Sequence, residues 1–83
     1  MKQLDKIEFD QLHQSLRAVI EDEFMYDFYR APHPDGPDVV WHIAWNDLRK
    51  RAAIVRASAS PRVRVAWLDV PSPQDLMSDC PAE

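Results

Sequence analysis

The chain has 83 residues, 14 acidic against 10 basic side chains, a hydrophobic fraction of 46% and a single glycine. This length allows one small domain with one core. Phosphate-binding loops need several glycines, so Gly36 alone excludes the P-loop and dinucleotide-binding classes. The single cysteine, Cys80, cannot form an intramolecular disulfide. No apolar run approaches the ~20 residues of a membrane span, and we expect a cytoplasmic protein without membrane contact.

Charge is distributed unevenly along the chain. Residues 1–47 hold ten acidic and four basic side chains, residues 48–68 hold six basic and no acidic ones, and residues 69–83 hold four acidic and no basic ones. This pattern predicts two separate charged surfaces. The acidic candidates are Glu21, Asp22, Glu23 and Asp27, and the basic candidates are Arg49, Lys50, Arg51, Arg56, Arg62 and Arg64.

The first half of the chain predicts a helix and then a strand. Apolar residues recur at helical spacing over 5–22, with Asp5 as a candidate N-cap, and the helix should end near residue 22 because Glu23 would continue the buried stripe. Aromatic alternation over 24–29 predicts a strand. The predicted buried residues here are Phe9, Leu12, Leu16, Val19, Ile20, Tyr26 and Phe28.

Three prolines and a Pro-Asp-Gly sequence predict a hairpin connection over 31–37. Residues 39–45 alternate with period two, which favours a strand over a helix. The segment 46–60 is ambiguous between a helix over 48–57 and a strand over 52–58, and we favour the strand. Residues 58–61 predict a turn, and residues 62–70 a further strand.

These elements predict an α+β domain over residues 1–70, in which an N-terminal amphipathic helix packs on a three- to four-stranded antiparallel meander sheet. Residues 71–83 are expected to form an acidic tail or a one-turn helix. The sheet would face the helix with Val39, Trp41, Ile43, Trp45, Val55, Val63, Val65 and Trp67. The other sheet face would carry His42, Ala44, Ile54, Arg56, Arg62, Arg64 and Ala66, and something else would have to cover it.

No residue pattern indicates catalysis, a metal or a cofactor. The three histidines and Cys80 offer no pair at metal-ligand spacing. Asp10 and His13 lie one predicted turn apart, and no nucleophile accompanies them. We therefore expect a non-enzymatic protein with neither cofactor nor metal.

The charge pattern favours a protein-protein interaction module, a small regulator or inhibitor acting through its charged surfaces. One version is an acidic phage-type antagonist that imitates nucleic acid and blocks a host complex. Self-association into a homodimer is a subsidiary prediction. The alternative is a nucleic-acid-binding protein that uses the basic segment 49–64, with tryptophans stacking on bases. A sequence pI near 5.2 argues against that alternative.

Overall fold

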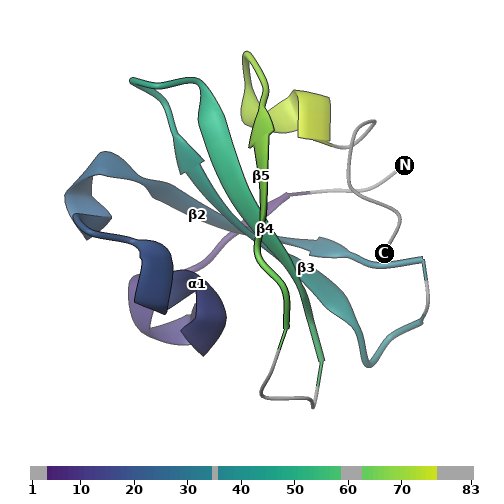
Figure 1. Ribbon diagram of the computed structural model, residues 1–83. Helices are drawn as coiled ribbons and strands as arrows, with labels where there is room; N and C mark the ends of the chain where they lie inside the picture. The colour runs from purple at the N-terminus through teal and green to yellow at the C-terminus, as the bar shows by residue number, and fades with distance from the viewer. Residues whose placement is uncertain (1–3, 35, 59–62, 77–83) are drawn as a thin grey trace.

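The computed structural model describes residues 4–34, 36–58 and 63–76, which form an antiparallel sheet flanked by short helices (Figure 1). The strands lie in sheet order β1-β2-β3-β4-β5, so each one pairs with its neighbour in the sequence. The predicted small α+β domain with an antiparallel meander is therefore confirmed, but the sheet has five strands instead of the predicted three or four and there is little helix. The elements are β1 (Asp5–Lys6), η1 (Phe9–Gln11), α1 (Gln14–Val19), η2 (Glu23–Met25), β2 (Asp27–Pro32), β3 (Val40–Asn46), β4 (Arg51–Ala57), β5 (Ala66–Asp69) and η3 (Pro73–Asp75), of which the η elements are 3₁₀ helices.

The prediction of one long helix over 5–22 is wrong. Its first residues form β1 instead, with Asp5 opposite Arg30 in β2, so strand pairing rather than a helix satisfies their backbone groups. The chain leaves helical geometry again at Leu12, where ψ is 145°. His13 then starts α1, because its Nδ1 accepts a hydrogen bond of 3.1 Å from the backbone N–H of Ser15.

The apolar stripe of this segment nevertheless reaches the sheet. Leu12 and Leu16 are 2% and 0% exposed, and Phe9 and Ile20 pack against the same cluster. A 3₁₀ turn followed by a short α-helix preserves the three- and four-residue spacing that brings these side chains to one side. The predicted burial of Val19 is wrong, since it is 37% exposed.

The strand predicted over 24–29 begins later. The side chain of Asp22 accepts a hydrogen bond of 3.0 Å from the backbone N–H of Phe24 and caps η2, which displaces the start of β2 to Asp27. That strand then runs to Pro32, into the segment predicted as a turn. The reversal follows it and includes Gly36 at φ 132°, a conformation that favours glycine.

The strand predictions for β3 and β4 are confirmed, and the alternative helix over 48–57 is wrong. Asn46 ends β3, and its side-chain oxygen accepts a hydrogen bond of 3.0 Å from the backbone N–H of Arg49. Lys50 has φ 52°, a left-handed conformation that is uncommon for a lysine. Because this tight turn reverses the chain, Arg51 can pair with Asn46 and begin β4.

Both faces of the sheet bury an apolar cluster, which corrects the single predicted core. Residues directly opposite each other in the ladder share a face, and Ile43 lies opposite Ile54 on the side away from α1. That cluster contains Ala31, Trp41, Ile43, Trp45, Ala52, Ile54, Val70 and Leu76. The cluster under α1 contains Leu12, Leu16, Phe28, Ala44, Ala53 and Val55, with Val63, Val65 and Trp67 packed against it.

The predicted assignment of the β3 side chains to faces is therefore inverted. Trp41, Ile43 and Trp45 face away from α1, whereas Ala44 packs beneath it. His42 lies on the α1 side as well, because it is opposite Val55. Alternation fixes which residues share a face, and it does not say which face the helix covers.

The C-terminal part of the described chain packs against the cluster on the face away from α1. The strand predicted over 62–70 is shorter, since β5 spans Ala66–Asp69. After it, η3 is held by a hydrogen bond of 3.2 Å from the Ser72 hydroxyl to the carboxylate of Asp75. Leu76 is 0% exposed, so residues up to this position pack on the sheet.

Candidate functional site

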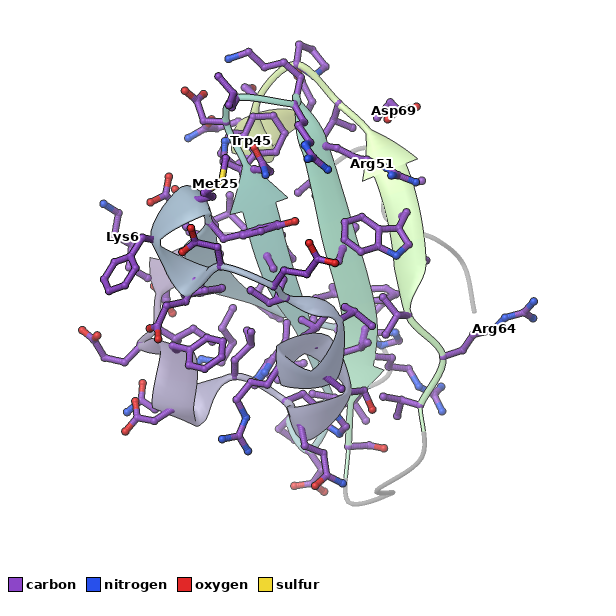
Figure 2. All side chains as sticks on the ribbon, turned by 60° about the vertical axis from the view of Figure 1, so that its left-hand side comes forward. Lys6, Met25, Trp45, Arg51, Arg64 and Asp69 are labelled. Atoms are coloured by element: carbon purple, nitrogen blue, oxygen red, sulfur yellow. The ribbon has the colours of Figure 1, made fainter. Side chains whose placement is uncertain are left out.

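A pocket of about 190 Å³ opens at one end of the sheet, on the face that α1 covers elsewhere. In Figure 2 α1 lies over the lower part of this face, whereas Arg51 lies near the upper ends of the strands. The helix ends at Val19 and therefore does not reach the strand ends. The lining residues are Val19, Glu21, Tyr26, Asn46, Arg49, Arg51 and Trp67.

The floor of the pocket is set by strand register. Asn46 of β3 lies opposite Arg51 of β4, which in turn lies opposite Asp69 of β5. These three residues share one face, and Trp67, two residues before Asp69, shares it too. The pocket thus combines side chains from three neighbouring strands, which makes its floor part of the rigid sheet.

Arg51 is positioned by two contacts. Its guanidinium carbon lies 4.7 Å from the centroid of the Trp67 ring, and its Nε lies 3.7 Å from Oδ1 of Asp69. The Asp69 side chain is 91% exposed, so this ion pair contributes little, on the order of 0–1 kcal/mol. Trp67 therefore orients the guanidinium, and solvent largely screens Asp69.

Arg49 differs from Arg51 in that its charged group is uncommitted. Its backbone N–H bonds to Asn46, which is 2% exposed, and this anchors the residue in the turn. Within residues 4–34, 36–58 and 63–76, no side chain forms an ion pair or a hydrogen bond with the Arg49 guanidinium. Five N–H donors are consequently available beside the pocket.

The neighbouring Lys50 takes a different direction. Its Nζ forms an ion pair of 2.9 Å with Asp47 and lies 6.0 Å from the centroid of the Trp45 ring, on the opposite side of the sheet. The basic turn 49–51 is therefore divided: Arg49 and Arg51 line the pocket, and Lys50 does not.

The acidic candidates are also divided. Glu21 lines the pocket together with Arg49 and Arg51, so the structure brings part of the acidic segment and part of the basic segment to one place. Asp22 caps η2. The other two, Glu23 and Asp27, are exposed near the start of β2.

The remaining basic candidates lie apart from the pocket. Arg56 is half-buried opposite Trp41 on the other face of the sheet. The side chain of Arg64 extends into solvent, as Figure 2 shows. Arg62 lies outside the described residues. The five described members of the six bases predicted as one surface are thus distributed over several.

Exposed apolar side chains occur on two segments at the same end of the sheet. Phe24 is 92% exposed and Met25 is 40% exposed in η2, and Leu48 is 77% exposed in the turn between β3 and β4. Asp27 pairs with Trp45, so β2 begins where β3 ends and the two segments flank the pocket end together (Figure 2). The segments that carry these exposed side chains also contribute Tyr26, Asn46 and Arg49 to the pocket lining.

Two titratable groups away from the pocket have shifted pKa values. Burial, the nearby His13 and the positive charge of Arg30 lower the pKa of His42 to about 4, so its imidazole is neutral near pH 7. Burial and the carboxylates of Asp27 and Asp47 raise the pKa of Tyr29. The Nδ1 of His42 accepts a hydrogen bond from the backbone N–H of His13, and we assign both groups structural roles.

Sequence reasoning missed Tyr26, Asn46 and Trp67 as members of the site. The sequence pattern assigns Tyr26 and Trp67 to the core, and it does not single out Asn46 as a site residue. Nothing in their spacing indicates convergence, because they belong to three different segments that only the folded chain brings together.

No group of three or more potential metal ligands occurs among the described residues. None of the helices in that part of the chain has the length and apolar character required to span a membrane. The fold and site define a small α+β domain with a polar, arginine-containing pocket. Comparison with known protein families, curated proteins and solved structures gave no match.

Proposed function

We propose that this domain is a non-enzymatic protein-protein interaction module and that its contact surface is the pocket end of the sheet. The observation that carries the proposal is the exposure of Phe24 and Leu48 at 92% and 77%, on the two segments that flank a pocket containing arginine and tryptophan. Aromatic and arginine side chains are the residues most enriched where protein partners bind tightly.

Burial of the tryptophans favours this function over nucleic-acid binding. Trp41 and Trp45 are each 2% exposed and belong to the cluster behind the sheet, so neither presents a ring to a base. Trp67 is half-buried, and its ring is already in contact with Arg51. Single-stranded nucleic acid is usually held by several open aromatic rings along a continuous basic groove.

The phage-type version of the proposal relies on an acidic surface alone. Glu21 stands beside Arg49 and Arg51, which interrupts a purely acidic face at that point. We therefore place the partner contact at the mixed surface, with the exposed carboxylates of Asp22 and Glu23 at its edge.

Partner capture with paired variants tests the proposal. The immobilised protein would be exposed to an extract of its native host in two forms, Phe24→Ser with Leu48→Ser, and the control Asp38→Ser with Gln74→Ser, which changes exposed residues elsewhere. We expect the first pair to lose specifically captured proteins and the control pair to retain them. Equal capture by both would overturn the proposed surface.

A second copy of this chain is one partner that the same experiment must distinguish. Light scattering of the purified protein at low and at ~0.5 M salt measures the mass directly, because exposed charge contacts are screened at high salt. A dimer that both Phe24→Ser and Leu48→Ser dissociate would identify the second copy as the partner.

A further inference from the structure

We propose that the pocket receives a single carboxylate side chain, an aspartate or glutamate, from the partner protein. This inference rests on the proposed function and specifies the chemistry of the partner segment. The guanidinium groups of Arg49 and Arg51 supply the donors, and Tyr26 and Trp67 supply aromatic walls.

The size of the pocket favours one side chain over a free small molecule. Pockets for drug-sized ligands and cofactors are commonly about 300–1,000 Å³. This pocket measures about 190 Å³ and is open to solvent on one side. It has room for the end of one side chain, while the chain that bears this side chain remains outside and contacts the exposed apolar residues.

The charge of the lining matches one negative charge. Among the lining residues, Arg49 and Arg51 contribute two positive charges and Glu21 contributes one negative charge, so one positive charge is in excess. Asp69, 3.7 Å from Nε of Arg51, is not part of the lining, and at 91% exposure its charge is largely screened by solvent. A carboxylate balances this excess, and it suits the planar fork of a guanidinium group. A phosphate dianion, or the consecutive phosphates of a nucleic acid, would place further negative charge beside Glu21.

The two arginines have different roles in this arrangement. Arg51 is fixed by its contact with Trp67, 4.7 Å from the ring centroid, and offers a preorganised donor. Arg49 has no side-chain partner among the described residues and can turn toward the incoming carboxylate. Arg49 is accordingly the residue whose removal should weaken binding without disturbing an existing contact.

The exposed apolar side chains explain why the carboxylate would belong to a protein. Leu48 immediately precedes Arg49, and Val19, 37% exposed, forms part of the pocket wall. A free carboxylate ion would gain nothing from these side chains. A peptide with apolar residues on either side of its acidic residue would bury them.

Nuclear magnetic resonance titration tests the inference with defined probes. The probes are the blocked peptides acetyl-Leu-Glu-Leu-amide and acetyl-Leu-Gln-Leu-amide and inorganic phosphate, each added to the full chain at ~20 mM salt, where charge contacts are weakly screened. The reporters are the Trp67 indole N–H and the Arg49 and Arg51 Nε–H signals. We expect the glutamate peptide to bind about tenfold more tightly than the glutamine peptide, since a charged acceptor strengthens the hydrogen bonds.

Three variants make the result specific. Arg49→Gln should weaken binding of the glutamate peptide about tenfold. Lys50→Gln should leave this binding unchanged, because the Lys50 ammonium pairs with Asp47 outside the pocket. Glu21→Gln should strengthen binding of the same peptide several-fold. Loss of folding could not produce this gain in affinity.

Two outcomes would overturn the inference. One is equal binding of the two peptides, and the other is phosphate binding more tightly than the glutamate peptide, which would indicate a phosphate or nucleic-acid site. Failure of the inference is distinguishable from failure of the proposed function. Suppose that Arg49→Gln leaves partner capture intact while Phe24→Ser with Leu48→Ser abolishes it. The proposed contact surface is then supported, and the proposed carboxylate site is wrong.

Discussion

The backbone N–H of His13 donates a hydrogen bond of 2.9 Å to Nδ1 of His42, which joins the start of α1 to the middle strand of the sheet. The acceptor nitrogen must be unprotonated for this bond to exist. The two imidazole rings meet edge to face with their centroids 6.4 Å apart. The position of the helix on the sheet therefore depends on the neutral form of His42.

Acidification should loosen this contact. The pKa of His42 is lowered to about 4 in the folded protein, against 6.5 for an ordinary histidine, so the unfolded chain takes up the proton first. The contribution of neutral His42 to stability is full above about pH 6.5 and is lost as the pH falls toward 4, by on the order of 3 kcal/mol. Urea unfolding at pH 7.5 and pH 4 measures the loss.

The control for this prediction is His42→Gln, which keeps a side-chain acceptor and cannot titrate. The carboxylates titrate in both proteins, so only the difference between the two pH profiles reports on His42. Identical profiles for the wild type and His42→Gln would contradict the assigned role.

Two leucines of opposite burial test the packing of the C-terminal segment. Leu76 is 0% exposed and Leu48 is 77% exposed. Leu76→Ala should reduce the free energy of unfolding by about 2–5 kcal/mol through loss of burial and creation of a cavity. Leu48→Ala should change it by no more than about 0.5 kcal/mol. Chemical denaturation of both variants provides the comparison, and a small effect at Leu76 would show that the segment is not packed as described.

The turn between β3 and β4 contains a local strain that glycine should relieve. Lys50 has φ 52°, and its ion pair with Asp47 is exposed and contributes little. We expect Lys50→Gly to keep or raise the free energy of unfolding, by up to about 1 kcal/mol. The matched change Arg49→Gly should lower it, because φ is not positive there and glycine only adds freedom to the unfolded chain. Thermal unfolding of the pair checks the order, and an equal loss of stability in both variants would show that the strain is absent.

The three tryptophans should differ in their access to solvent. Trp41 and Trp45 are 2% exposed, whereas Trp67 is half-buried at the pocket. Acrylamide should therefore quench mainly the fluorescence of Trp67, and Trp67→Phe should remove most of the quenchable fraction. Comparable quenching in Trp67→Phe and the wild type would mean that a second tryptophan is accessible and would reopen the nucleic-acid interpretation.

Local patterns predict the strands well and the helix poorly. Alternation of side chains predicts β3, and the choice of strand over helical periodicity predicts β4. Both are central strands that pair with a strand on each side, so the local pattern and the observed structure agree. The helix over 5–22 fails because Asp5 has a pairing partner, Arg30, that lies 25 residues further along the chain. Helical periodicity cannot represent such a distant backbone partner.

The candidate site is less predictable for a related reason. Arg49, Arg51 and Glu21 are visible in the sequence as charged residues, but their meeting depends on α1 ending at Val19 and on the register of β3, β4 and β5. Trp67 also has apolar neighbours, so alternation alone assigns it to the core. Whether a side chain at a strand end is covered or open depends on the length of the helix above it.

Photo-crosslinking tests the central claim, that the pocket end of the sheet is the surface that binds a partner protein. A photoreactive amino acid would replace Leu48 at that end or Asp38 in the exposed connection between β2 and β3, and the adducts formed in the native host would be identified by mass spectrometry. The account predicts one defined protein adduct from position 48, sensitive to Arg49→Gln, and none from position 38. Equal or absent adducts at the two positions would contradict it.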